Sequence, residues 1–107
     1  MRKARYEVGK RSELAPDIGQ TVKLGEGECT LFLHEGKCHA TGSVCPHQNA
    51  PLNNAPVEKG KVICRRHCYR FDLKTGDCAT IGGYGIPIFT VIEEGDTIFV
   101  EVWEYED

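Results

Sequence analysis

Two Cys/His pairs constrain this chain more than any other feature of its sequence. The first is Cys45-Pro46-His47, and the second, Cys64-Arg65-Arg66-His67, begins after sixteen intervening residues. Thiolates and neutral imidazoles are both ligands of transition metals, so these pairs can supply two sulfur and two nitrogen donors to one centre. A fold that uses all four donors must bring two separate segments of the chain together.

Short strand-like runs separated by turn residues recur along the chain, which predicts an all-β fold, a sandwich or barrel of antiparallel sheets. One hairpin is expected to turn at Glu35-Gly36 and a second at Glu94-Gly95-Asp96, because glycine accepts the backbone conformation of a tight turn. Residues 12–16 allow one helical turn at most, ended by Pro16. Strands are expected at residues 6–8, 21–24, 29–34, 37–40, 61–64, 69–73, 88–92 and 97–103.

The candidate ligands fall on loops. Residues 41–60 show no periodic pattern and contain three prolines, so they are expected to form one long loop with the first pair near its start. Loops of that length usually have a function. The second pair opens residues 64–72, between two expected strands, and residues 82–85 form a third, glycine-rich loop.

Length and charge exclude several classes of protein. A chain of 107 residues is expected to form a single domain, 1–107, and no apolar run approaches the length of a membrane span. The basic N-terminus is not followed by an apolar stretch, which favours a cytoplasmic protein without a secretory signal. A formal charge of −3 without a basic stripe argues against nucleic-acid binding. Arg65, Arg66 and Arg70 surround the second pair and are candidates for contact with a partner protein.

Four further cysteines and one histidine need an interpretation. Cys29 and Cys38 lie within expected strands, where a free cysteine behaves as a small buried hydrophobe. A disulfide between Cys68 and Cys78 remains open, although nothing marks an oxidising compartment. His39 precedes the first pair by a few residues and is a candidate for the second coordination sphere.

Two other chemistries fit the bare residues. Two cysteines and two histidines also make a tetrahedral structural zinc site, although zinc fingers tend to keep their cysteine pair and histidine pair separate. A Cys/His nucleophilic pair is a third possibility. No oxyanion motif, phosphate loop or substrate domain accompanies it, so the chain alone is not expected to be an enzyme.

Beyond their spacing, the two loops resemble those of Rieske-type ferredoxins. Residues 45–52, CPHQNAPL, resemble the first cluster loop of that family nearly throughout, and residues 64–72 retain its Cys, His, Phe and Asp. Arg65 stands where proline is common and Cys68 where glycine is common. Thr75-Gly76 and the segment around Pro87 also match, so the resemblance extends over residues 8–102.

The resemblance implies a Rieske-like sandwich or barrel with a small cluster-binding subdomain, built from loops 41–60 and 64–72. One [2Fe–2S] cluster per chain would be held by Cys45 and Cys64 on one iron and by His47 and His67 on the other. Phe71 occupies the place of a tyrosine whose hydroxyl raises the potential in the high-potential branch. We therefore expect a reduction potential in the lower part of the Rieske range of roughly −150 to +300 mV.

The function that follows from the resemblance is electron transport. The chain would be a soluble, monomeric one-electron carrier that takes electrons from a flavin-containing reductase and passes them to a terminal oxygenase or another redox enzyme. Such a carrier is a component of an oxidoreductase system and not itself a catalyst. An alternative is the small subunit of a larger reductase, as in nitrite reductase, which would bind a large partner stably.

Overall fold

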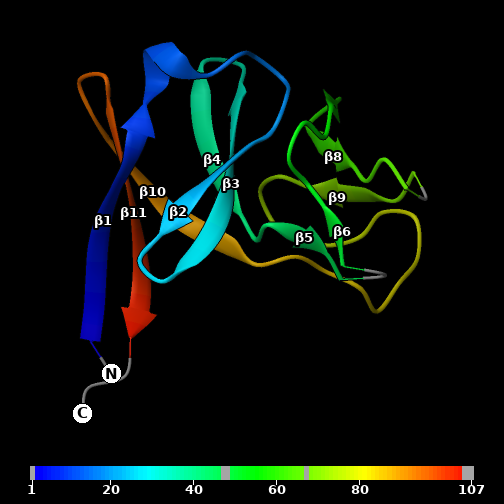
Figure 1. Cartoon of the computed structure of the whole chain (residues 1–107). Helices are drawn as coiled ribbons and strands as arrows, with labels where there is room; N and C mark the ends of the chain where they lie inside the picture. Colours follow the sequence, from blue (N-terminus) through cyan, green and yellow to red (C-terminus); the bar gives the residue numbers. More distant parts are fainter. Residues whose placement is uncertain (1, 47–48, 67, 105–107) are drawn as a thin grey trace.

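The computed structural model describes residues 2–46, 49–66 and 68–104, and it confirms an all-β architecture of antiparallel sheets (Figure 1). A six-stranded sheet forms the base, in the order β1-β11-β10-β4-β3-β2. A three-residue 3₁₀ helix, Arg11–Glu13, follows the first strand, where one helical turn at most was expected. The strands of the base sheet are β1 Arg2–Lys10, β2 Gln20–Leu24, β3 Gly27–His34, β4 Lys37–Thr41, β10 Ile88–Glu94 and β11 Thr97–Glu104.

The first strand is much longer than the sequence predicted. It pairs with β11 from Arg2 to Lys10, with one irregularity between Glu7 and Gly9. Its outward positions carry charged side chains, which hide the strand from a search for apolar alternation. Glu101 of β11 lies 3.7 Å from the guanidinium of Arg5, so cross-strand charge pairs support this edge of the sheet.

Both predicted hairpins are present. Glu35 and Gly36 connect β3 to β4 with backbone φ angles of +52° and +76°. Two successive residues with positive φ are characteristic of the type I′ turn that suits the twist of paired strands. Gly95, with φ +62°, lies in the turn between β10 and β11.

The remaining strands form an insert between β4 and β10, on the side of the base sheet away from the two termini (Figure 1). The expectation of one patternless loop over residues 41–60 was wrong, because strands of two residues are too short to show any period. The inserted strands form a two-stranded sheet, β5 Val44–Cys45 with β6 Ala50–Pro51, and a three-stranded sheet of β7 Val57–Glu58, β8 Lys61–Ile63 and β9 Arg70–Asp72.

Two hydrophobic cores lie on opposite faces of β3. Leu31 belongs to the core within the curved base sheet, and the next residue, Phe32, belongs to the core beneath the insert. Successive side chains of a strand point to opposite faces, so both faces of β3 are covered here. This explains why four consecutive β3 residues, Cys29, Thr30, Leu31 and Phe32, are fully buried.

Within the part of the chain that the structure describes, no helix has the length and apolar character needed to cross a membrane.

Candidate metal centre

The first candidate loop is held at its base by a short hairpin. Val44 pairs with Pro51 and Cys45 with Ala50, and the Leu52 amide donates a hydrogen bond of 2.9 Å to the Ser43 carbonyl. The pairing places Cys45 at the inner end of the loop, where its side chain is fully buried. His47, the second expected ligand of this loop, lies outside the described residues.

The second candidate loop is a closed turn that follows β8. The Cys64 amide donates to the Tyr69 carbonyl, and the Cys68 amide donates to the Cys64 carbonyl, both at 2.8 Å. Cys68 has φ +58°, a backbone conformation that glycine adopts without cost. This conformation accounts for the glycine that is common at this position in the family that the sequence resembles. Cys64 is fully buried, and His67 lies outside the described residues.

The structure brings Cys45 and Cys64 into one buried cluster, although nineteen positions separate them in the sequence. Neither thiol forms a disulfide. Apolar side chains surround both cysteines, so each is shielded from solvent. Two buried thiols at the bases of neighbouring loops fit the thiolate half of an iron–sulfur site. Among the described residues alone, no group of three or more His, Cys, Asp or Glu is arranged around a metal position.

A set of hydrogen bonds fastens the first loop to the second loop and to the base sheet. The Arg65 Nε donates to the Asn54 carbonyl at 2.9 Å, and the Asn54 amide donates to the Gly19 carbonyl at 2.8 Å. The Thr21 amide donates to Asn53 Oδ1 at 2.9 Å. No role was assigned to Asn53 or Asn54 from the sequence. Asn54 has φ +66°, which asparagine tolerates better than most residues, and that tolerance was the available signal.

A third segment, residues 72–87, completes the insert between β9 and β10. Asp72 Oδ1 accepts hydrogen bonds from the Lys74 and Thr75 amides at 2.7 and 3.1 Å, and these bonds lower the pKa of its carboxyl group. Gly76 then turns the chain with φ +82°, and its carbonyl accepts a hydrogen bond from the Ile86 amide. Ile86 thereby packs into the same core as Cys45 and Cys64.

The other cysteines divide into two kinds. Cys29 and Cys38 are buried in the base core, as predicted, and desolvation raises the pKa of each thiol to about 11. Cys68 is exposed and Cys78 is partly buried, and both are free in this structure. The disulfide that the sequence left open between them is therefore not formed.

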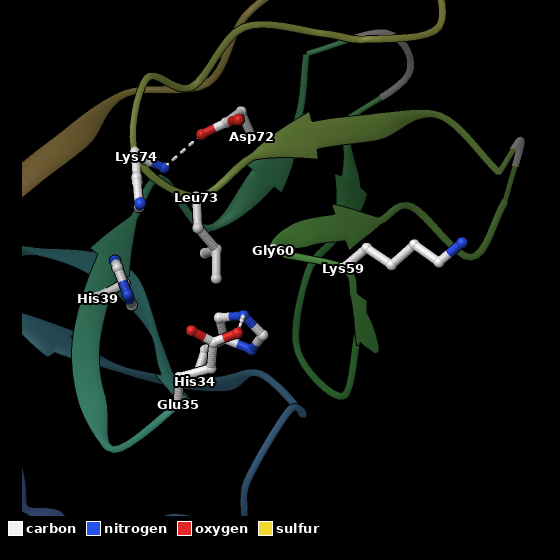
Figure 2. Close-up of a pocket in the computed structure, with 8 residues that line it drawn as sticks. All are labelled: His34, Glu35, His39, Lys59, Gly60, Asp72, Leu73 and Lys74. Carbon is white, nitrogen blue, oxygen red and sulfur yellow. Dashed lines mark hydrogen bonds and ion pairs between the residues drawn. The ribbon is translucent and has the colours of Figure 1, made fainter.

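His39 lies in a cleft of about 220 Å³ between β4 and the end of β9, not beside either buried cysteine (Figure 2). Burial lowers the pKa of its imidazole. His34 lines the same cleft, with its Nδ1 2.7 Å from Asp17 Oδ1. Neither Cys45 nor Cys64 lines this cleft, so the structure gives no support to a second-sphere role for His39.

Residues 4–89 match the family model described as the Rieske [2Fe-2S] domain, and the chain belongs to this family. Its cofactor is accordingly a Rieske-type [2Fe–2S] cluster. The two buried thiols at the bases of adjacent loops are consistent with that cofactor.

Two curated relatives match most of the chain. The ferredoxin component of the alkene monooxygenase system of Xanthobacter autotrophicus is 31% identical over 78 residues, which are 72% of this chain and 64% of that protein. Apoptosis-inducing factor 3 of Homo sapiens is 35% identical over 80 residues, which are 74% of this chain and 13% of that protein. The chain thus matches less than two thirds of the length of these relatives.

Solved structures share the fold over nearly the whole chain. A protein described as the small subunit of an NADH-dependent nitrite reductase from Mycobacterium tuberculosis superposes with a TM-score of 0.86, covering 98% of this chain and 100% of its own, at 21% identity. The ferredoxin of carbazole 1,9a-dioxygenase from Nocardioides aromaticivorans gives 0.82, covering 90% and 95%, also at 21% identity. At this identity the likeness concerns the fold.

Proposed function

We propose that residues 1–107 form a single Rieske domain that carries electrons one at a time. In this proposal Cys45 and Cys64 bind one iron of the cluster, and His47 and His67 bind the other, from loops 41–60 and 64–72. The observation that carries the proposal is the meeting of two fully buried, unbridged thiols from these two loops in one core.

The bound cluster would supply a reversible one-electron redox couple. The protein's own residues keep water from the thiolate end of the site, because Leu52, Phe71 and Leu73 are fully buried around the two cysteines. Phe71 presents no hydroxyl to the site. One hydrogen bond that would raise the potential is therefore missing, and we expect a potential in the lower part of the range from roughly −150 to +300 mV.

The proposed partners are a flavin-containing reductase, which donates the electron, and a terminal oxygenase or other redox enzyme, which accepts it. The ferredoxin component of the alkene monooxygenase system supports this choice, because it is related over most of this chain. We propose that the protein works in the cytoplasm as a monomer and has no catalytic activity of its own. Stable copurification with one large reductase chain would instead favour the role of a bound small subunit.

The test of the cofactor is low-temperature EPR of the dithionite-reduced, anaerobically purified protein, with iron and acid-labile sulfide measured on the same sample. A rhombic signal with an average g of about 1.9, two irons and two sulfides would support the proposal. One equivalent of zinc with a silent spectrum would overturn it and leave a structural zinc module.

The ligand assignment has its own test. Cys64→Ser is expected to abolish the Rieske spectrum, whereas Cys78→Ser, a matched change of a free and partly buried cysteine, is expected to keep it. His67→Cys is expected to lower the potential if the cluster assembles, because a thiolate brings more negative charge than an imidazole. An unchanged spectrum in Cys64→Ser would remove Cys64 from the ligand set.

A further inference from the structure

Charge is divided unevenly between the two ends of the molecule. Residues 42–87, which form the insert between β4 and β10, contain six basic residues and three carboxylates, Glu58, Asp72 and Asp77. The rest of the chain contains seven basic and thirteen acidic residues. A protein with a formal charge of −3 therefore has a positively charged insert on a strongly negative base.

The arginines show the same division in their contacts. Arg2, Arg5 and Arg11, on the base, each lie within 3.4 Å of a glutamate oxygen of β10 or β11. Arg65, Arg66 and Arg70, on the insert, are exposed, and among the described residues none of the three forms an ion pair. Three guanidinium groups near the proposed cluster thus have no carboxylate partner among the described residues.

Apolar side chains are exposed on the same insert. Val44, Ile81 and Tyr84 are 39%, 41% and 39% exposed, and they account for three of the four exposed large hydrophobic residues in the described part of the chain. Val44 stands next to Cys45 in the first loop. The Arg70 amide donates a hydrogen bond to Thr80 Oγ1, which places the backbone of Arg70 beside the segment that carries Ile81.

From this division we infer that the insert is a docking surface for an acidic face of a redox partner protein, with Ile81 and Tyr84 as exposed apolar residues on the segment beside Arg70. The inference rests on the proposed electron-transfer function and adds the charge of the partner to it. Guanidinium groups pair well with carboxylates. Exposed apolar residues among polar ones are typical of protein interfaces. Such complementarity chiefly raises the rate of association and fades as salt screens it.

The first experiment measures local charge with two small oxidants of opposite sign, ferricyanide and tris(phenanthroline)cobalt(III). Each takes one electron from the dithionite-reduced, desalted protein, and ferricyanide is thereby reduced to ferrocyanide. Stopped-flow rates are followed as ionic strength rises from about 0.01 M to about 0.5 M. The rate with ferricyanide is expected to fall and the rate with the cobalt complex to rise. The opposite signs, which the net charge of the whole protein would give, would overturn the inference.

Matched variants locate the charge. Arg66→Gln/Arg70→Gln and Lys10→Gln/Lys37→Gln both remove two exposed positive charges, the first pair from the insert and the second from the base. At low salt the insert variant is expected to react with ferricyanide roughly threefold to tenfold more slowly than the parent, with the base variant within about twofold. Equal effects of the two pairs would overturn the inference.

A protein probe tests docking itself. Oxidised cytochrome b5, which is acidic, and cytochrome c, which is basic, accept one electron in the same assay. Reduction of cytochrome b5 is expected to slow with added salt and in the insert variant, and reduction of cytochrome c is expected to do neither. Equal responses of the two cytochromes would overturn the choice of an acidic partner. Failure of the proposed function would give another result, because a protein without a redox-active cluster would reduce none of the four oxidants.

Discussion

Gly76 is the residue at which a single methyl group should most disturb the insert. Its φ of +82° lies in the left-handed region, and an added Cβ would overlap the Ile86 carbonyl oxygen and approach Ile88 Cγ1 to 3.0 Å. The overlap is with backbone, so it cannot be relieved by a change of rotamer. The Ile86 amide also donates a 2.9 Å hydrogen bond to the Gly76 carbonyl. Relief of the overlap would therefore move the two backbone segments that this hydrogen bond joins.

The expected loss of stability in Gly76→Ala has two parts. The left-handed conformation costs an L-residue about 1–2 kcal/mol. Loss or distortion of the Ile86 hydrogen bond adds about 0.5–1.5 kcal/mol. Gly83 provides the control, because its φ is +91° but no heavy atom lies within 4 Å of an added Cβ. Gly83→Ala should therefore lose only the stability that the left-handed conformation costs.

The assay is thermal unfolding of the cluster-loaded protein, followed by far-ultraviolet circular dichroism and by the visible absorption of the cluster. At about 4–8 °C per kcal/mol for a domain near this size, Gly76→Ala should unfold roughly 2–12 °C below Gly83→Ala. Cluster absorption should bleach earlier in Gly76→Ala as well, because Ile86 packs into the core that holds Cys45 and Cys64. Equal unfolding temperatures for the two variants would refute the steric argument.

Three further predictions concern side chains around the insert and the base. A maleimide should label Cys68 in the folded protein and leave Cys29 unlabelled. Cys68 is exposed, whereas burial raises the pKa of the Cys29 thiol to about 11. Peptide mass spectrometry measures the labelling of each cysteine, and equal labelling would contradict the burial of Cys29. Burial lowers the pKa of His39 below its ordinary value of 6.5, so the unfolded chain binds this proton more readily. The free energy of unfolding should then fall as the pH drops through about 6.5, and it should fall less steeply in His39→Gln. Denaturant unfolding measures this free energy at each pH, and the same pH dependence in both proteins would contradict the prediction. Arg65→Lys keeps the charge but loses the Nε donor to the Asn54 carbonyl. Iron should then pass from the protein to a chelator roughly twofold to tenfold faster, which is equivalent to a loss of about 0.5–1.5 kcal/mol. An unchanged rate of iron transfer would show that this hydrogen bond does not hold the two loops together.

The hairpins could be read from the sequence because their signals are local. Glu35-Gly36 and Gly95 stand between alternating apolar runs, and turns of this kind depend on the residues within them. The buried state of Cys29 and Cys38 followed from their positions inside such runs. Local chemistry is the part of a fold that a single sequence expresses most directly.

The features that the sequence did not reveal depend on partners distant in the chain. The first strand is stabilised by residues about a hundred positions away, such as Trp103 opposite Lys3. The strands β5 and β6 were missed for a different reason, because each has only two residues although their partners lie five to seven positions apart. The role of Asn54 could be assigned only when Gly19 and Arg65 were placed beside it.

The position of the insert has a consequence for how such proteins can be varied and engineered. The chain leaves the base sheet at Thr41 and rejoins it at Ile88, and these two residues are direct partners on adjacent strands. The Gly42 amide and the Pro87 carbonyl add a 3.0 Å hydrogen bond just beyond them. Everything from residue 43 to residue 86 therefore behaves as a cassette with adjoining ends. Loops within such a cassette can change in length while the register of its host strands stays the same.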